Sequence, residues 1–140
     1  MIVQDVQILR KKSYDIQEYD KILVDKLLDI LKNTRGLGIS AIQIGVPLKV
    51  CIIRTNRNEP AVFWNTTIIE KSIEKINSDE GCLSIPGVYR QIVRHRDIVV
   101  KNGDGLKYAL SEKEAIILQH EMDHWNGILI TDYEIEDCSI

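Results

Sequence analysis

Two histidines and a glutamate near the C-terminal end of the chain have a spacing that suits a metal centre. His120 and His124 are four residues apart, and Glu121 directly follows the first of them. On an α-helix, residues four apart lie on the same face, so both imidazoles could hold one metal ion. A glutamate beside such a pair can reach water at the metal. The pattern predicts a metal-dependent hydrolytic site, and a chance group of hydrogen-bonded side chains is the plain alternative.

A catalytic site of this kind needs a third protein ligand besides an open position for water. His95 is the remaining histidine, but it stands between Arg94 and Arg96 on a predicted strand edge, where we expect it to be solvated. Cys82 is the better candidate, because Gly81 before it allows a tight backbone turn that presents the sulfur. A lone cysteine is more often a small buried apolar residue, so both interpretations remain open for Cys82.

A glycine-rich segment, Gly36-Leu-Gly-Ile-Ser-Ala-Ile-Gln43, matches the dinucleotide fingerprint G-x-G-x-x-A in form. That fingerprint needs a strand before it and a helix after it. Here a predicted helix precedes the segment and Pro47 soon follows it, so we reject the dinucleotide interpretation. Two interpretations remain open: a glycine-rich turn, and an exposed strand whose free backbone groups pair with an extended peptide.

Two helices are expected to frame these motifs. Apolar residues recur at three- and four-residue intervals from Ile16 to Leu31, which predicts an amphipathic helix in the N-terminal part. Ser111 and Glu114 have the form of a capping box at the start of the helix that carries the histidines. Asn126-Gly127 supplies a left-handed stop signal at its end. The residues between these signals are mostly apolar, so this second helix should be buried.

Short β-branched runs between the two helices predict strands at 50–54, 62–65, 67–69, 89–94 and 98–101, with a hairpin turn at 102–105. Helix, several short strands and then a buried helix is the pattern of an α+β domain. We therefore expect antiparallel β-strands packed around a buried metal-binding helix, with an N-terminal amphipathic helix. The length and the lack of internal repeats predict one domain over residues 1–140.

Composition excludes several classes of function. A composition of 44% apolar and 28% charged residues is ordinary for a globular protein, and a net charge of −3 disfavours a nucleic-acid or anionic-lipid surface. We find no membrane-length apolar run and no signal-peptide pattern. The odd number of cysteines, three, makes a disulfide framework unfavourable. We expect a cytoplasmic monomer without nucleic-acid or membrane binding.

Taken together, the three motif segments resemble the peptide deformylases. That family carries G-x-G-x-A-A-x-Q, E-G-C-[LV]-S and Q-H-E-x-D-H segments in this order, and the resemblance spans residues 36–127. It implies a hydrolase that removes the N-formyl group from N-formylmethionyl peptides of newly made proteins and releases formate. It also implies one divalent metal ion, Fe(II) or Zn(II), for which Ni or Co can substitute. Nascent peptides would be the partners, with transient proximity to the ribosome.

The resemblance also implies a role for each matching residue. Cys82, His120 and His124 would be the metal ligands, and Glu121 the general acid and base. The Gln43 side-chain amide and the Leu83 backbone N–H would stabilise the oxyanion. The substrate would contact Leu37, Gly38, Ile39, Glu80, Ile116 and Ile117. Arg94 and Asp123 would form an ion pair that supports the metal helix.

Some positions depart from the family pattern. Ser40 replaces the first of two alanines, Ile42 precedes Gln43, and Trp125 stands where leucine is usual. We expect these changes to alter packing rather than ligands, although Trp125 could reshape the helix end. Only residues 131–140 follow the metal helix region, as in short members encoded by some phages, for which the host cytoplasm would be the site of action.

Two alternatives are weighed against the deformylase interpretation. The first is an HExxH-type zinc metalloprotease, whose third ligand would come from the acidic tail residues Asp132, Glu134, Glu136 and Asp137. The second is an inactive domain in which the metal only clamps a binding surface. Loss of Glu121 or Gln43 would mark such a domain, and both residues are present.

Overall fold

The computed structural model describes residues 1–133 and has an α+β fold built of antiparallel strands. The helical segments are α1 (Val6–Leu9), α2 (Lys21–Lys32), η1 (Ala41–Ile44), α3 (Lys113–Trp125) and η2 (Ile130–Asp132), of which η1 and η2 are 3₁₀ turns. The strands are β1 (Gly38–Ser40), β2 (Val50–Arg54), β3 (Pro60–Trp64), β4 (Thr67–Lys71), β5 (Lys75–Cys82), β6 (Ile85–His95), β7 (Asp97–Lys101) and β8 (Lys107–Ser111).

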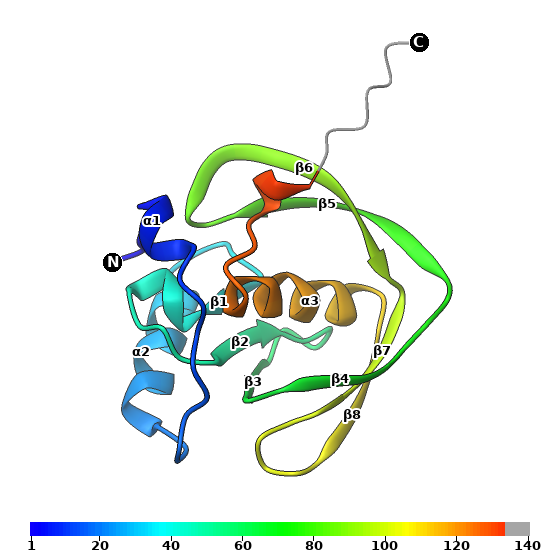
Figure 1. The fold of residues 1–140 in the computed structure, drawn as a ribbon, viewed down its shortest axis with the longest axis horizontal. Helices are drawn as coiled ribbons and strands as arrows, with labels where there is room; N and C mark the ends of the chain where they lie inside the picture. The colour runs from blue at the N-terminus through cyan, green and yellow to red at the C-terminus, as the bar shows by residue number, and fades with distance from the viewer. Residues whose placement is uncertain (134–140) are drawn as a thin grey trace.

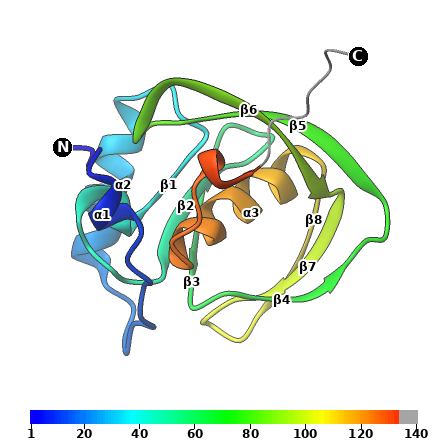
Figure 2. The same cartoon turned by 45° about the horizontal axis from the view of Figure 1, so that its top comes forward.

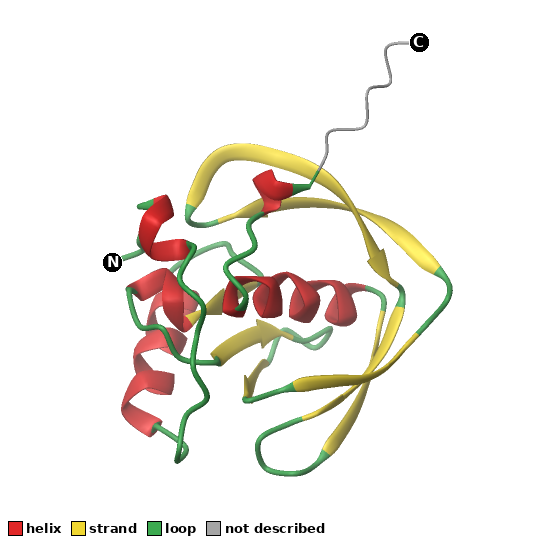
Figure 3. Cartoon of the chain, viewed as in Figure 1, coloured by secondary structure: helices red, strands yellow, loops and turns green. Residues whose placement is uncertain are grey.

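The strands form two three-stranded sheets and one long hairpin. The sheets have the orders β1-β2-β3 and β4-β7-β8, and β5 pairs with β6. α3 lies among them and packs against β1, β2, β6 and β8 (Figures 1 and 2). α2 lies to one side and contacts β1 and β2 (Figure 3). The expected fold, antiparallel strands around a buried helix with an amphipathic helix before them, is confirmed.

β2 is the central partition of the core because both of its faces are buried. Successive residues of a strand point to opposite faces. Val50 and Ile52 therefore pack toward α2, whereas Cys51 and Ile53 pack toward α3. All four side chains are fully buried, so β2 holds the two helices at a set separation. Trp125 joins the cluster around α3, where it is also buried and extends the core to the helix end.

The N-terminal amphipathic helix begins later than the apolar periodicity predicts. α2 starts at Lys21 because the Asp20 side chain accepts a hydrogen bond from Leu23 N at 3.0 Å and caps the first turn. Ile16 is buried in the preceding loop, where both of its backbone groups bond to the Asn65 side chain. The apolar period continues beyond the helix because the loop residue also packs into the core.

The predicted capping box at the start of α3 is wrong. Ser111 is the last residue of β8, and the N-cap is Glu112, at φ 54° and ψ −120°, without a side-chain cap. Glu114 instead accepts a hydrogen bond from Asn56 N at 2.9 Å. Strand pairing therefore prevails over local capping here. The stop signal at the other end is confirmed, because Gly127 has φ 71° and its N–H bonds to His124 O.

The strands predicted from β-branched residues are present, but the mostly polar strand β5 was not predicted. β2 has the predicted bounds, and β3, β4, β6 and β7 overlap their predicted ranges. β5, with the sequence Lys-Ile-Asn-Ser-Asp-Glu-Gly-Cys, is mostly polar, and pairing with β6 makes it a strand.

Among residues 1–133, no helix has the length and apolar character needed to cross a bilayer.

Backbone strain at Glu112 leads to a stability prediction. A side chain at positive φ costs on the order of 1 kcal/mol or more, which glycine avoids. Glycine also loses about 0.4–1 kcal/mol more conformational free energy on folding. Relief of roughly 1–3 kcal/mol of strain should therefore leave a net gain of about 1 kcal/mol in the free energy of unfolding of Glu112→Gly, measured by urea denaturation. The exposed ion pair with Arg96 is lost, but such pairs contribute little. Glu112→Ala is the matched control: it loses the same pair and keeps the Cβ, and an equal gain there would rule out strain as the cause.

Candidate metal centre and active site

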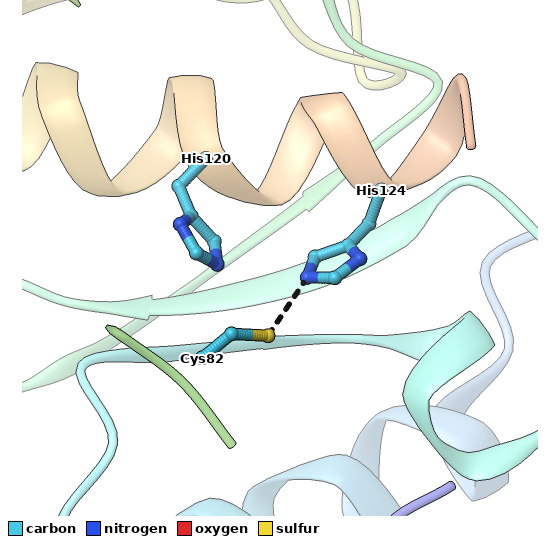
Figure 4. Close-up of side chains that lie close together, drawn as sticks. All are labelled: Cys82, His120 and His124. Carbon is cyan, nitrogen blue, oxygen red and sulfur yellow. Dashed lines mark hydrogen bonds between the residues drawn. The ribbon is translucent and has the colours of Figure 1, made fainter. Parts of the chain in front are cut away.

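One cysteine and two histidines converge near the turn of the β5–β6 hairpin. The candidate ligand atoms of Cys82, His120 and His124 all lie within 4.8 Å of one another. Cys82 Sγ is 3.4 Å from His124 Nε2, and the three side chains point toward one another (Figure 4). Among residues 1–133, no other group of this kind is found. The structure thus brings together the three residues that the resemblance names as ligands.

The secondary structure explains this convergence. His120 and His124 lie one turn apart on α3, and their ring centroids are 5.2 Å apart. Cys82 ends β5, directly after an irregularity in the pairing at Gly81. A Cβ on Gly81 would stand 3.0 Å from the Tyr89 ring, so the absence of a side chain lets the hairpin close tightly there. The hairpin carries Cys82 to the face of α3 that bears both histidines.

A buried ion network holds the histidine ring. Arg94 donates from Nε and Nη2 to the two oxygens of Glu80, at 2.9 and 2.7 Å, and from Nη1 to Asp123 Oδ2 at 2.6 Å. His120 Nδ1 donates a hydrogen bond to Glu80 Oε1 at 2.9 Å. Nε2 is then the ring nitrogen that is left to bind a metal ion. The predicted Arg94–Asp123 pair is present. Glu80, expected at the substrate, lines the pocket, but its carboxylate oxygens bind Arg94 and His120.

The electrostatics of the donor set suit a cation. Burial disfavours the charged forms, and together with the nearby His120 and Arg94 charges it lowers the pKa of His124 to about 3. Burial also opposes a charge on His120, but contacts with Cys82 and Glu80 outweigh it and raise the pKa of that imidazole to about 10. The two imidazoles thus differ in their affinity for a proton, and only His120 is stabilised in its charged form. Because a ligating histidine must be deprotonated, metal binding at His120 would release that proton.

Glu121 is buried at the same place and is held by groups from β1. Ser40 Oγ lies 2.9 Å from the Glu121 carbonyl oxygen and 3.1 Å from its Oε1. A Cβ on Gly38 would stand 2.6 Å from Glu121 Oε2, so glycine is needed for this close approach. Burial raises the pKa of the carboxyl to about 7. Glu121 can therefore both accept and return a proton near neutral pH.

Ser40 contacts none of the three candidate ligands, as expected, but its role is more than packing. Its side chain is fully buried, and its hydroxyl contacts Glu121 as described. The available signal was chemical: a hydroxyl in a buried segment needs a partner, and sequence alone does not say which residue provides it.

Gln43 is fixed with its amide nitrogen toward the cysteine turn. Its Oε1 accepts a hydrogen bond from Ser40 N at 2.8 Å, which sets the orientation of the amide. Nε2 then lies 3.2 Å from Ser84 Oγ and 3.7 Å from Cys82 Sγ. Leu83 stands between these two residues, and its side chain covers Gly36, where a Cβ would be 2.6 Å away. The glycine-rich segment and the cysteine turn are therefore packed against each other.

A pocket of about 860 Å³ opens over these groups. Cys82, His120 and Glu121 line it together with most of the residues predicted to bind substrate. Those residues are Leu37, Gly38, Glu80, Ile116 and Ile117. Ile39 is the exception, because its side chain is fully buried in the cluster around α2. Its main chain pairs with Ile52 of β2, so Ile39 does not line the pocket.

His95 is not solvated as expected. It is half-buried, its Nδ1 lies 2.8 Å from Ser72 O, and its backbone N–H bonds to Gln119. This histidine helps join β6 to the turn after β4 and to α3. It is not part of the Cys82 group.

A cysteine and two histidines beside a buried glutamate, in an α+β fold, define a metallohydrolase site. The chain matches the family Polypeptide deformylase over residues 1–138. It is 38% identical to the peptide deformylase of Borreliella burgdorferi over 141 residues, covering 95% of this chain and 86% of that relative. The chain belongs to the peptide deformylase family, hydrolases that remove N-formyl groups from nascent peptides.

Solved structures agree with this assignment. The peptide deformylase of Thermotoga maritima matches with a TM-score of 0.88 at 29% identity, covering 98% of this chain and 97% of that one. A probable peptide deformylase from Synechococcus phage S-SSM7 matches with a TM-score of 0.85 at 34% identity, covering 96% and 99%. Both solved proteins therefore have the architecture described here over nearly their full lengths.

The network around Arg94 predicts strong coupling. Removing Arg94 leaves the buried Glu80 carboxylate and the half-buried Asp123 carboxylate without their cation, and breaking a buried pair in this way typically costs about 3–5 kcal/mol. We expect Arg94→Met and Asp123→Asn each to lower the free energy of unfolding, with a coupling of about 0.5–3 kcal/mol in the double mutant. Urea denaturation of the four proteins measures it. Arg96→Met, at an exposed arginine two residues away, is the control and should change stability little. A cycle that closes to zero would contradict the pairing.

Proposed function

We propose that Cys82, His120 and His124 hold one divalent metal ion and that Glu121, Gln43 and Leu83 carry out deformylation beside it. The single observation that supports this most strongly is the convergence of the three donor atoms within 4.8 Å at a pocket that Glu121 also lines. These residues come from β5 and α3, and no local sequence signal joins them. A buried donor set with an adjacent proton acceptor is what amide hydrolysis requires.

The donor chemistry narrows the choice of metal. One thiolate and two imidazoles suit Zn(II) or Fe(II), and Ni or Co could substitute. When bound, such an ion polarises a carbonyl and brings the pKa of water toward neutrality. With Fe(II), the oxidisable Cys82 sulfur makes the enzyme sensitive to oxygen.

Glu121 is proposed to move the proton. Near neutral pH a carboxylate with a pKa of about 7 can take a proton from the attacking water. The water oxygen then bonds to the formyl carbon, and the carbon–nitrogen bond of the formamide breaks. The same carboxyl returns the proton to the leaving nitrogen, so the products are formate and a free N-terminal methionine. Ser40 and Gly38 keep Glu121 in place for both transfers.

Gln43 and Leu83 are proposed to stabilise the negative charge that forms on the formyl oxygen. The Gln43 amide is already oriented by Ser40 N, with Nε2 toward the segment that contains Leu83. Because the donor is held before reaction, no reorganisation is needed when the charge develops.

The pocket is proposed to take the methionine side chain and the peptide backbone. Leu37, Ile116 and Ile117 supply apolar surface for the side chain. β1 is the edge strand of its sheet and pairs only with β2. The backbone groups of Leu37 and Ile39 face β2, so the main chain of Gly38, which faces the free edge, is left to pair with an extended peptide. We also predict that the protein is a monomer and that it acts beside the ribosome, in the cytoplasm or in the cytoplasm of a phage's host.

The two alternative functions find less support. A generic metalloprotease would need a ligand from the tail, but the Asp132 carboxylate is paired with Arg10 at 2.6 Å, and Glu134, Glu136 and Asp137 lie outside the described residues. An inactive binding domain would not need its acid–base residue, yet Glu121 and Gln43 are both held beside the donor set.

The direct test is formate release from formyl-Met-Ala-Ser by protein purified without oxygen, with metal content measured on the same sample. We expect turnover with about one Fe(II) or Zn(II) per chain and its loss after chelation. Metal-loaded protein that cleaves internal peptide bonds but releases no formate would support the protease alternative instead.

Glu121→Gln separates proton transfer from metal binding. The amide can still accept a hydrogen bond from Ser40 but cannot accept a proton, so turnover should fall roughly 100- to 10,000-fold while metal content is retained. His120→Ala is the comparison and should lose the metal. Equal metal loss in both variants would make Glu121 a ligand and not the acid and base.

Gln43→Glu tests the oxyanion role. The variant keeps an oxygen for Ser40 N–H but lacks the N–H donors, so kcat should fall about 100- to 1000-fold. Charge on the formyl oxygen exists only in the transition state, and KM should therefore change little. A raised KM with unchanged kcat would instead make Gln43 a substrate-binding residue.

A further inference from the structure

Tyr133 lies outside the segments that carry the deformylase motifs, yet its hydroxyl joins the ion network of the site. It follows η2, which comes after α3 and contacts both strands of the β5–β6 hairpin (Figure 1). The hydroxyl donates to Asp123 Oδ2 at 2.5 Å and accepts from Arg94 Nη1 at 3.1 Å. The ring also lies against the guanidinium, with Arg94 Cζ 5.1 Å from its centroid. One side chain thus contacts both members of the ion pair.

These contacts continue to the metal centre. Arg94 Nη1 bonds to both Asp123 and Tyr133, while Nε and Nη2 bond to Glu80. Glu80 Oε1 in turn accepts from His120 Nδ1. The orientation of the guanidinium therefore determines where the Glu80 carboxylate lies, and that carboxylate determines the rotation of the imidazole. Groups that orient a ligand in this way tune metal affinity without touching the metal.

A second contact places Tyr133 from the start of the chain. Arg10 binds both oxygens of Asp132, each at 2.6 Å, and also donates to Gly127 O at 3.3 Å. Asp132 Oδ2 accepts from Leu129 N at 2.8 Å, which closes the turn that leads to Tyr133. Gly127 packs against the Arg10 backbone so closely that a Cβ there would stand 2.4 Å from Arg10 O. The N-terminal segment therefore holds residues 127–132 beside the hairpin.

We propose that Tyr133 is a positioning residue for the metal centre, set in place by the Arg10–Asp132 pair, which orients His120 through Arg94 and Glu80. The proposal rests on the proposed ligand role of His120. The hydroxyl adds no charge, so its effect is geometric: it restrains Arg94 from the side opposite Glu80. Without it, the guanidinium and the carboxylate that holds the imidazole gain freedom, and the ligand set is less preorganised.

Tyr133→Phe is the test, because it keeps the ring against Arg94 and removes only the hydroxyl. Metal affinity is measured by competition with a chelator, and the absorption spectrum of the cobalt-substituted protein reports ligand geometry. We expect affinity to fall about 10-fold, the lower end of the roughly 10- to 100-fold effects of groups that support metal ligands. We also expect kcat to fall with little change in KM. Tyr108→Phe, at a hydroxyl that bonds to Asp104, is the matched control and should behave like wild type.

Two comparisons make the outcome decisive. His120→Ala should lose the metal; if it keeps wild-type affinity, the proposed function fails and this inference fails with it. If His120→Ala loses the metal while Tyr133→Phe has wild-type affinity and spectrum, the inference about Tyr133 alone is overturned, even if the melting temperature falls. Arg10→Met should weaken metal binding in the wild-type background and add nothing to Tyr133→Phe. A full further loss in the double variant would contradict the role of Arg10.

Discussion

The arrangement of this site depends on one buried cation, Arg94. Its guanidinium is removed from water, which is costly unless each of its nitrogens finds a partner of opposite charge. Glu80 and Asp123 provide these partners from two different elements, β5 and α3. Glu80 precedes Cys82 by two residues, and Asp123 directly precedes His124. The contacts that offset the desolvation of Arg94 therefore also align the β5–β6 hairpin with α3. This alignment places the Cys82 sulfur beside the two imidazoles.

Two buried glutamates close to His120 have pKa values shifted in opposite directions, which their surroundings explain. Burial raises the pKa of both, but hydrogen bonds from Arg94 and His120 outweigh it at Glu80 and lower its pKa to about 2. Glu121 has no cation bonded to its carboxylate among the described residues, and burial dominates, so its pKa rises to about 7. Under the proposed function, the first remains a fixed anion that orients a ligand and the second exchanges a proton. One pair of identical side chains thus takes two roles.

Close backbone packing brings the remaining groups within reach. β2 is buried on both faces and sets the separation of α2 and α3, and β1 runs along its edge against α3. Gly38 is the point of closest approach, because a side chain there would meet Glu121, Ile117 and the β2 backbone. The edge of β1 that is not paired with β2 then runs along the pocket. The close contact at Gly38 therefore both packs β1 against α3 and leaves the free edge of β1 at the pocket.

Local signals in the sequence determined the α+β class, the stop at Gly127, the β-branched strands and the four-residue spacing of the histidines. These features depend on periodicity and on single-residue backbone preferences, which act over a few residues. Tertiary structure decided that Cys82 meets His124 across 42 residues and that Ser40 meets Glu121 across 81. It also made a strand of the polar segment 75–82 and put Glu112 at a positive φ. These outcomes lie beyond local reading because each depends on which distant group offsets the cost of burying a charge, a hydroxyl or an unpaired strand edge.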